Sequence, residues 1–487
     1  MLTLPFLLGP PLLASAVAML VRPYRRIVSS TSVACAVVSV AAAVWLAFDV
    51  VGGRTGAGRT PAVGAWDVDA LSALLAGCIT FVAALASMLA PAGGDDTGYT
   101  TEQTRRYHIY VNAFVFTMLV AVTIQNVALM WVAVEATTIA SAMAIPLNRT
   151  KASVEASWKY ILVCSVGIAL AFAGTVLGYF DFVTTAGHVP NALNWSVLLH
   201  AAPSLHPGLL RLAFAFILVG YGTKAGLAPM HTWLPDAHSE APSTVSAMMS
   251  GVLLAVAMYA IARWKAVVDV SIGPEFTSRM LIGFGLLSVA IGTFSLVTQR
   301  HYKRMLAYSS VEHMGLVGIG LGLGPLGVFA AWLHVVNHAV AKSTSFLLAG
   351  RILHRYHTTD IDRVTGLIRA MPRTGVLFAG GILALVGLPP FGLFVSEFLL
   401  VQAAFTARRP WLAAIVLLLL LTAFVSLLAH LNRMLYGEPP EGVVIGESRE
   451  WSTLALVVPV AVLIVLGVVL PGPVSALIDQ CVRNLTP

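Results

Sequence analysis

The sequence predicts an all-α polytopic membrane protein. Of its 487 residues, 58% are hydrophobic and only 10% are charged, whereas about a quarter of the residues in a soluble globular domain are charged. The mean hydropathy is +0.85. Apolar runs of about 20 residues, the length a helix needs to cross a bilayer, recur along the whole chain. An outer-membrane barrel is excluded, because its strands alternate apolar and polar residues over short segments.

The chain 1–487 is expected to form one integral membrane domain without a soluble domain or a long linker. Its first apolar segment ends in MLVRPYRR with no small-residue cleavage site, so it is interpreted as a span and not as a signal peptide. The hydropathy pattern predicts about fourteen spans. They cover residues 3–20, 31–50, 69–90, 108–127, 129–147, 157–179, 210–234, 242–262, 279–299, 305–322, 326–350, 374–403, 410–431 and 452–470.

The basic residues predict the orientation of the chain, because Lys and Arg are enriched in loops on the cytoplasmic side. If the N-terminus lies outside, roughly two thirds of the Lys and Arg residues fall in inside loops. The loop 180–209 contains no Lys or Arg, which is typical of an external loop. The sequence therefore predicts a multi-pass protein of the bacterial or archaeal inner membrane with both termini on the outer side.

No cofactor or metal site is expected in this chain. The four cysteines are not arranged in C-x-x-C pairs, so they indicate neither a disulfide framework nor an iron–sulfur or zinc site. No segment is suited to bind NAD or flavin. The net charge of +7 is attributed to arginines that flank spans, and nucleic acid is not an expected partner.

Ionisable residues inside predicted spans mark the candidate functional site. A charge at mid-membrane costs at least a few kcal/mol and usually belongs to an ion or proton path. Glu135 stands alone in an apolar span, and Lys224 lies five residues before Pro229, which is expected to break its helix. A broken helix exposes backbone groups that suit an ion site. Glu135 is the candidate partner of Lys224, and a structural ion pair without proton traffic is the alternative.

A polar cluster follows this predicted break, at the inner mouth of the span. It consists of His231, Asp236, His238 and Glu240, within the segment HTWLPDAHSE. These residues have two interpretations of equal weight: a solvated loop, or a place where protons enter. His231, Asp236 and His238 are therefore considered only as possible accessory residues.

Three titratable residues share one face of the span 326–350. His334, His338 and Lys342 follow one another at intervals of four in HVVNHAVAK. Residues at i and i+4 stack on a helix face, so the three form a column about 12 Å long at 1.5 Å per residue. A single histidine on a helix is usually a satisfied core residue, but three titratable groups in register favour a functional role.

A second broken helix is expected at GLPPFGLFVSEF. Pro389 and Pro390 interrupt an apolar run, and Glu397 follows within two helical turns. Paired interruptions of this kind indicate internal repeats in transporters. Two five-helix units of inverted topology are predicted, 108–262 and 279–431, followed by the last span 452–470. Because the ionisable groups are spread through both halves, they favour a proton relay over a single substrate pocket.

Four segments resemble the antiporter-like proton-pumping subunits of complex I, Mrp antiporters and group 4 hydrogenases. They are GTKAGLAPMHTWLPDAHSEAPSTVSAMMSGVLL, KRMLAYSSVEHMG, HVVNHAVAKSTSFLLAG and GLPPFGLFVSEF. The resemblance covers roughly residues 100 to 435 and is strongest to the F component of hydrogenase-4-type complexes. It implies fourteen helices, two inverted repeats and two discontinuous helices. It also implies roles in proton translocation for Glu135, Lys224, His334, His338, Lys342 and Glu397.

One departure from the family pattern concerns the middle of the span 242–262. Many relatives carry a lysine there, whereas this chain has Ala255. The link between Lys224 and the second half must then use another group, for which His313 and water are candidates. Glu312 and His313 are accordingly possible accessory residues. If no such link exists, the protein pumps poorly or not at all.

The resemblance implies a proton-translocating subunit of a multisubunit redox complex, with redox cofactors only in partner membrane and peripheral subunits. Protons and lipids are its expected small partners. The alternatives are an Mrp-type Na⁺/H⁺ antiporter subunit and a non-pumping scaffold subunit. A bis-histidine haem protein is disfavoured, because His334 and His338 share one helix face and cannot clamp both sides of a haem.

Overall fold

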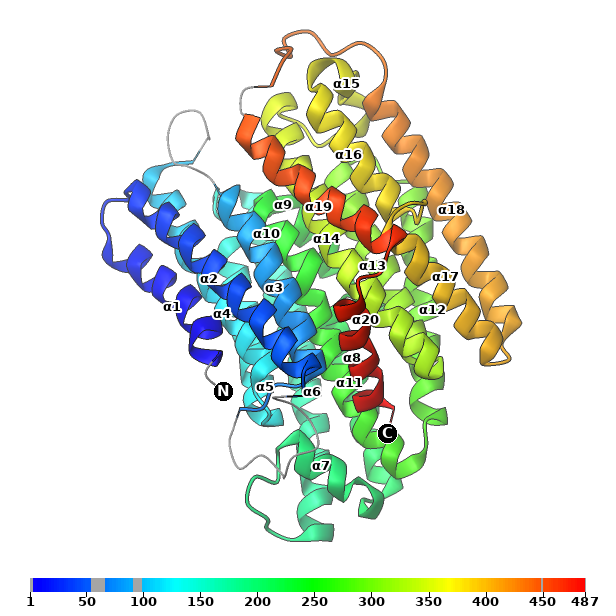
Figure 1. Cartoon of the computed structure of the whole chain (residues 1–487). Helices are drawn as coiled ribbons and strands as arrows, with labels where there is room; N and C mark the ends of the chain where they lie inside the picture. The colour runs from blue at the N-terminus through cyan, green and yellow to red at the C-terminus, as the bar shows by residue number, and fades with distance from the viewer. Residues whose placement is uncertain (1–2, 54–65, 91–98, 448–449, 487) are drawn as a thin grey trace.

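The computed structural model describes residues 3–53, 66–90, 99–447 and 450–486 (Figure 1). Within these ranges the regular elements are helices, joined by a few isolated β-bridges. The long helices of the first half are α1 (Leu4–Leu20), α2 (Arg26–Val51), α3 (Ala70–Met88), α4 (Thr101–Thr123), α5 (Val127–Ala144), α6 (Lys151–Ala186), α8 (Pro207–Ala225) and α11 (Leu254–Ile272). Between them lie the shorter α7 (Trp195–Ala201), α9 (Trp233–Glu240) and α10 (Ser243–Met248).

The second half also consists mainly of long helices. It contains α12 (Glu275–Val297), α13 (Tyr302–Leu321), α14 (Gly324–Tyr356), α16 (Pro372–Leu385), α17 (Gly392–Thr406), α18 (Pro410–Leu435), α19 (Glu450–Val468) and α20 (Gly472–Leu485), with the short α15 (Leu367–Ala370). Figure 1 shows α1 and α2 at one side of the bundle and α18 at the opposite side. The segment Ser243–Ile272, formed by α10, the π-helical turn Met249–Leu253 and α11, is the most enclosed candidate span.

Eight helices of the described chain are long and apolar enough to cross a membrane. A ninth crossing is added if the end of α19 and α20, which are bent by 71° to each other, are taken as one broken span. The prediction of a polytopic helical membrane protein is thereby confirmed. Three predicted spans, now α4, α13 and α14, are long but too polar for this criterion. For α14 the physical reason is clear: His334, His338 and Lys342 lower its hydropathy.

Two elements differ from the sequence-based expectation. The predicted external loop 180–209 contains the end of α6 and the short helix α7. Beyond the last predicted span lies α20, which is amphipathic and buries Leu477, Ile478, Cys481 and Leu485. It is too short and too polar to register as a span. Its residue Asn484 donates a hydrogen bond of 3.2 Å to the Asp69 carboxylate at the start of α3.

Small residues bring pairs of helices into close contact, and this contact positions the functional side chains. On α6, Gly167 and Ala171 face Gly220 of α8, where an added Cβ would lie 2.6 Å from the Gly167 carbonyl oxygen. On α12, Gly292 packs against the backbone of Glu312 on α13. Small residues at helix interfaces allow such an approach of backbones inside a membrane. Lys224 lies one helical turn after the first of these crossings, and Glu312 lies at the second.

Replacing Gly220 by Ala is expected to destabilise the protein by about 1–3 kcal/mol, the usual cost of overpacking a tight interface. The new methyl group would overlap the α6 backbone, which cannot move without displacing the whole helix. Thermal unfolding in detergent measures the effect. Gly283→Ala is the matched control, because nothing lies within 4 Å of a Cβ placed there. Equal unfolding temperatures for the two variants would contradict the interpretation.

Candidate functional site

Lys224 is fully buried in the last turn of α8 and is surrounded by hydroxyl groups. Its ammonium group donates hydrogen bonds of 2.7 Å to Thr138 Oγ1 and 2.6 Å to the Tyr160 hydroxyl. Thr138 in turn donates a hydrogen bond of 3.2 Å to Glu135 Oε2. The sequence suggested Glu135 as the partner of Lys224. The hydrogen-bonded connection between these two side chains, however, passes through the Thr138 hydroxyl.

Further hydroxyl groups complete this set. Ser165 on α6 donates a hydrogen bond of 2.9 Å to Glu135 Oε1, and Ser141 lies 2.8 Å from the Tyr160 hydroxyl. We call Glu135, Thr138, Tyr160, Ser165 and Lys224 the Lys224 cluster. Its three hydroxyl residues were not predicted from the sequence. Of the three, only Thr138 could have been predicted from the sequence, because it lies one helical turn after Glu135 and on the same helix face.

Thr138 provides a test of this connection. Thr138→Val is expected to slow transport that depends on Lys224 by about tenfold to a hundredfold, since a hydrogen bond to a charged group contributes about 1.5–3 kcal/mol. Thr138→Ser keeps the hydroxyl and should restore most of the activity. Thr137→Val is the matched control, because the Thr137 hydroxyl donates only to the Val134 carbonyl oxygen. Similar activities of the Thr137 and Thr138 variants would exclude the bridging role. Proton uptake by vesicles measures the transport.

Helix α8 ends directly after Lys224, and the polypeptide is not helical again until α9. Gly226 adopts a left-handed conformation with φ of 74°, and the Leu227 N–H closes the helix end on the Gly222 carbonyl oxygen at 2.8 Å. Pro229 lies between α8 and α9. The Ala228 N–H donates to Ser288 Oγ on α12 at 2.9 Å, which joins this break to the second half of the chain. The break therefore has a fixed position relative to both halves.

The residues proposed for the inner mouth occupy different environments. Asp236 is held by ion pairs with Lys159 of α6 at 3.4 Å and Arg304 of α13 at 2.9 Å. Such an arrangement ties three helices together. His231 is half-buried, and its ring centroid lies 6.3 Å from that of Tyr308. Asp236 and His231 are thus both partly accessible from outside the bundle.

His238 is fully buried on α9, so it does not belong to a solvated loop. Its ring stacks on Phe346 of α14 with centroids 5.2 Å apart, and neither ring nitrogen has a hydrogen-bond partner. The charges of Lys303 and Lys342 act on it. A buried imidazole without partners is unusual, and its position makes it a candidate link between the α8–α9 break and α14.

The predicted column on α14 is completed by a residue from α13. His334, His338 and Lys342 are all fully buried. His313 lies beside both histidines: its Nδ1 is 2.9 Å from Nε2 of His334, and its ring centroid is 5.0 Å from that of His334 and 5.3 Å from that of His338. The sequence indicated His313 only as an accessory group, but in the structure its ring lies beside those of both His334 and His338.

Lys342 lies at one end of the column. Its ammonium group donates hydrogen bonds to the Leu306 carbonyl oxygen at 2.8 Å and to Ser309 Oγ, both on α13. Glu312, also buried on α13, is the carboxyl group whose charge acts on Lys342. Lys342 thus has neutral hydrogen-bond acceptors around it and a carboxyl group nearby, as Lys224 does in the first half.

Glu397 lies at the other end, on α17, after the second break. Helix α16 ends at Leu385 and α17 begins at Gly392, so Pro389 and Pro390 lie between the two helices. The Glu397 carboxylate packs against Gly387, where any Cβ would overlap it. We call His313, His334, His338, Ser396 and Glu397 the histidine cluster. Ser396, which was also not predicted from the sequence, lies 2.9 Å from His334 Nδ1.

Three members of the histidine cluster also form a group that fits a divalent transition metal. One ligand atom each from His313, His334 and Glu397 lie within 4.8 Å of one another. Two imidazoles and one carboxylate are a common metal-binding set. The three residues come from three different helices, so they do not form a sequence motif with metal-ligand spacing. For this reason no metal site was predicted from the sequence.

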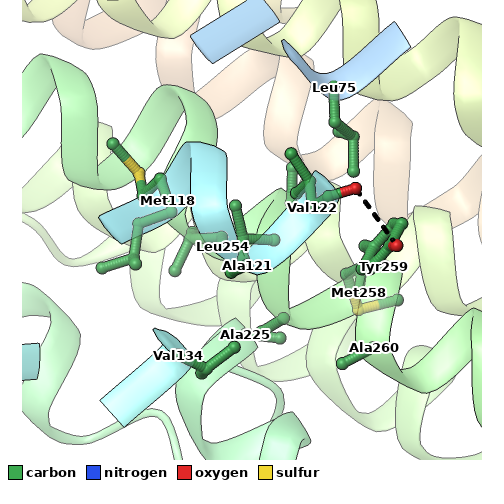
Figure 2. Close-up of a cluster of buried hydrophobic side chains, with 14 of the residues drawn as sticks. Leu75, Met118, Ala121, Val122, Val134, Ala225, Leu254, Met258, Tyr259 and Ala260 are labelled. Carbon is green, nitrogen blue, oxygen red and sulfur yellow. Dashed lines mark hydrogen bonds between the residues drawn. The ribbon is translucent and has the colours of Figure 1, made fainter. Parts of the chain in front are cut away.

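Ala255 is buried in α11, with 1% of its surface exposed. It belongs to a core cluster that also contains Met118, Val134, Ala225 and Leu254; Figure 2 shows these four side chains around α4, α5, α8 and α11. The Tyr259 hydroxyl donates to the Val122 carbonyl oxygen at 3.3 Å and so is engaged by α4.

One polar contact crosses from the central segment to α13. Ser250, in the π-helical turn Met249–Leu253, lies 2.7 Å from Ser310 Oγ. Ser310 donates to the Leu306 carbonyl oxygen at 3.1 Å, and the same carbonyl accepts from Lys342. Turns of π-helix often occur at functional sites. Two hydroxyl groups therefore connect the segment that carries Ala255 to Lys342.

A helical membrane bundle with two helix breaks and buried lysine, histidine and glutamate side chains defines the class of antiporter-like membrane subunits. The comparisons with known proteins agree with this class. The chain belongs to the NADH:quinone oxidoreductase/Mrp antiporter transmembrane family, whose model matches residues 125–422. The sequence-based resemblance to the antiporter-like subunits of complex I, Mrp and hydrogenase-4 complexes is thereby confirmed.

Relatives and solved structures support the assignment. A hydrogenase-4 component F homolog from Methylacidiphilum infernorum (isolate V4) is 40% identical over 368 residues, which are 75% of this chain and 77% of the relative. A chain of an archaeal membrane-bound sulfane sulfur reductase has a TM-score of 0.89 at 25% identity, covering 100% of this chain and 98% of that one. A chain of the Mrp complex from Dietzia sp. DQ12-45-1b has a TM-score of 0.84 at 21% identity, covering 100% and 99%, and shares the fold.

Proposed function

We propose that this antiporter-like subunit translocates protons within a multisubunit redox complex of the hydrogenase-4/complex I type. The observation that carries the proposal is the pair of clusters, one beside each helix break, in which a buried lysine or histidine is hydrogen-bonded to hydroxyl groups and lies near a carboxyl group. Glu135, the carboxyl group of the first cluster, is half-buried. Ionisable residues in a membrane are costly and are retained where they carry ions or protons.

The proposal places fourteen crossings in the inner membrane with both termini outside. Eight of the proposed crossings are the long apolar helices. The remaining crossings are α1, α4, α13, α14, the broken pair α16–α17 and α19. Residues 108–262 and 279–431 form the two inverted repeats, each with one broken helix, and 452–470 forms the last crossing. Broken helices at mid-membrane in corresponding positions of two repeats are typical of transporters.

In the first repeat, Lys224 holds a proton and exchanges it with Glu135. Thr138 accepts a hydrogen bond from Lys224 and donates one to Glu135. Its hydroxyl group therefore fixes the positions of these two proton-carrying side chains relative to each other. The lysine ammonium has three donors, of which two are used in the described contacts. Deprotonation of Lys224 would free Thr138 and Tyr160 to change partners, which couples the charge state of Lys224 to that of Glu135.

In the second repeat, the proposed path runs from Lys342 through the histidines to Glu397. His338 has no hydrogen-bond partner and can turn between Lys342 and His313. His313 is hydrogen-bonded to His334. Imidazole is suited to this role, because it can accept a proton on one nitrogen and release another from the opposite one. His231, Asp236 and His238 are proposed as accessory groups at the inner side.

This chain supplies no redox group in the proposal, so partner subunits must provide the electron-transfer chemistry. The test is redox-driven proton uptake by inside-out membrane vesicles that contain the complete complex, energised by the electron donor that its co-purified subunits identify. We expect uptake to persist in Na⁺-free medium and to be unaffected by a sodium ionophore. Uptake that requires Na⁺ would instead support the Mrp-type alternative.

A non-pumping scaffold is the second candidate function, and Ala255 favours it. An alanine side chain can neither bind nor release a proton at this position, where many relatives are expected to carry a lysine. In a scaffold, removal of Lys224 would leave the number of protons moved per electron pair unchanged. The hydroxyl contact Ser250–Ser310, the buried His238 and water are the remaining candidates for a connection.

A further inference from the structure

The surroundings of Ser396 determine which nitrogen of His334 carries a hydrogen atom. The Ser396 hydroxyl oxygen is fully buried on α17, 2.9 Å from His334 Nδ1 and 2.8 Å from the Leu393 carbonyl oxygen. A carbonyl oxygen can only accept, so the single hydroxyl proton of Ser396 points to Leu393. Ser396 must then accept the hydrogen bond from His334. The Nδ1 atom of His334 is therefore the protonated nitrogen.

The same assignment of hydrogen atoms extends to His313. A neutral imidazole carries one N–H, so Nε2 of neutral His334 has a lone pair. That atom lies 2.9 Å from Nδ1 of His313, which must supply the hydrogen. The remaining nitrogen of His313, Nε2, then has a lone pair and is buried without a hydrogen-bond partner. The ring of His338 lies 5.3 Å away, centroid to centroid.

His334 differs in this respect from its neighbours. Both of its nitrogens are hydrogen-bonded, whereas His338 and His238 have no partner at either nitrogen. The tautomer of those two histidines is therefore not selected by hydrogen bonds, and they can exchange protons at both nitrogens. In the histidine cluster the selection begins at Ser396, because only its hydroxyl group is in turn fixed by a backbone carbonyl.

We propose that Ser396 is a positioning residue that fixes His334 as the Nδ1–H tautomer and so keeps the lone pair of the neutral ring on Nε2. The inference rests on the proposed function and deepens it. A proton that binds Nε2 of His313 makes this ring an imidazolium. The Nδ1 proton of His313 then crosses to Nε2 of His334, which leaves His313 neutral and His334 protonated on both nitrogens.

In the proposed path, the doubly protonated His334 releases its extra proton to Glu397. One nitrogen of His334 and one of His313 lie within 4.8 Å of a Glu397 carboxylate oxygen, so Glu397 is a carboxylate near enough to be the proton acceptor. Transfer of the Nε2 proton to Glu397 gives a carboxylic acid and a neutral His334. Loss of the Nδ1 proton is blocked, because Ser396 would have to transfer its own proton to the amide carbonyl of Leu393. Ser396 therefore directs the proton toward Glu397.

The test measures the tautomer directly, in the complete complex labelled with ¹⁵N-histidine. The infrared and solid-state NMR signals of an Nδ1–H imidazole are assigned to His334 as those lost in His334→Gln but retained in His313→Gln, because His313 is also an Nδ1–H imidazole. We expect Ser396→Ala to remove these signals and to lower proton uptake by vesicles at least tenfold, and Ser396→Thr, which keeps the hydroxyl group, to retain both. Persistence of the Nδ1–H signal in Ser396→Ala would overturn the proposal.

Ser343→Ala is the matched control. Ser343 is equally buried, donates to the carbonyl oxygen three residues earlier, and contacts no histidine through its hydroxyl in the described structure. It should leave the tautomer signal and proton uptake unchanged, and an equal loss in this variant would show that Ser396 acts only through helix packing. If the wild-type complex moved no protons, the proposed function would fail, while the tautomer signal would still decide the role of Ser396.

Discussion

Replacing Lys224 by Met is expected to abolish proton translocation while the complex still assembles. A positioned proton donor or acceptor typically contributes about a hundredfold or more to the rate of a step that uses it. Met is similar in length and apolar, so the buried position next to α6 remains filled. The measurement is proton uptake by vesicles at a fixed rate of electron transfer.

Stability provides the control for this variant. The hydrogen bonds of the Lys224 ammonium in the described structure go to the neutral Thr138 and Tyr160 hydroxyls, so Met leaves no carboxylate that has lost a direct hydrogen bond. Lys224→Met should therefore not lower the unfolding temperature. Lys303→Met should lower it, because Lys303 donates to the Ser239 and Ala241 carbonyl oxygens at 2.8 and 2.7 Å and thereby fixes the end of α9. Equal destabilisation by both substitutions would indicate that Lys224 is a structural residue.

His313→Leu is the second substitution with a large expected effect. The ring of His313 contacts those of both His334 and His338, so its loss leaves an apolar gap in the proposed path. We expect proton uptake to fall by roughly tenfold to a hundredfold, comparable to the effect of His334→Leu, with the cost of one lost proton carrier in each case. The same vesicle assay at fixed electron transfer measures it.

A double-mutant cycle gives this prediction a sharper form. If His313 and His338 act in one path, the double variant His313→Leu/His338→Leu should be no worse than the more damaging single variant, because the effects of residues that act in one network are not additive. Multiplication of the two single effects would mean that the histidines contribute independently, and the path from His338 through His313 would be wrong.

The sequence was sufficient to predict the class of fold and the family. Long apolar runs have one stable solution in a bilayer, the helix, and four sequence motifs carry the resemblance to the antiporter-like subunits. The periodicity of His334, His338 and Lys342 was also informative, since an interval of four residues fixes a common helix face. The roles of these three residues, and of Glu135, Lys224 and Glu397, remain predictions.

The contacts between helices were not predictable in the same way. Thr138, Tyr160 and Ser396 are hydroxyl residues of ordinary kinds in apolar helices, and nothing in their local sequence shows which side chain they face. His313 is separated by 21 residues from His334, and only the packing of α13 on α14 brings the two rings together. The span predicted at 326–350 is a helix, α14, although its titratable side chains make it too polar to be counted among the apolar helices long enough to cross a membrane.

The number of protons moved per electron pair tests the central claim most directly. It is measured in vesicles that contain the complete complex, with the wild-type chain, with Lys224→Met and with His313→Leu. If the two clusters form a working proton path, each substitution should lower the ratio while electron transfer continues. An unchanged ratio in both variants would contradict the proposed path and would make this protein a scaffold that keeps its buried charges without using them.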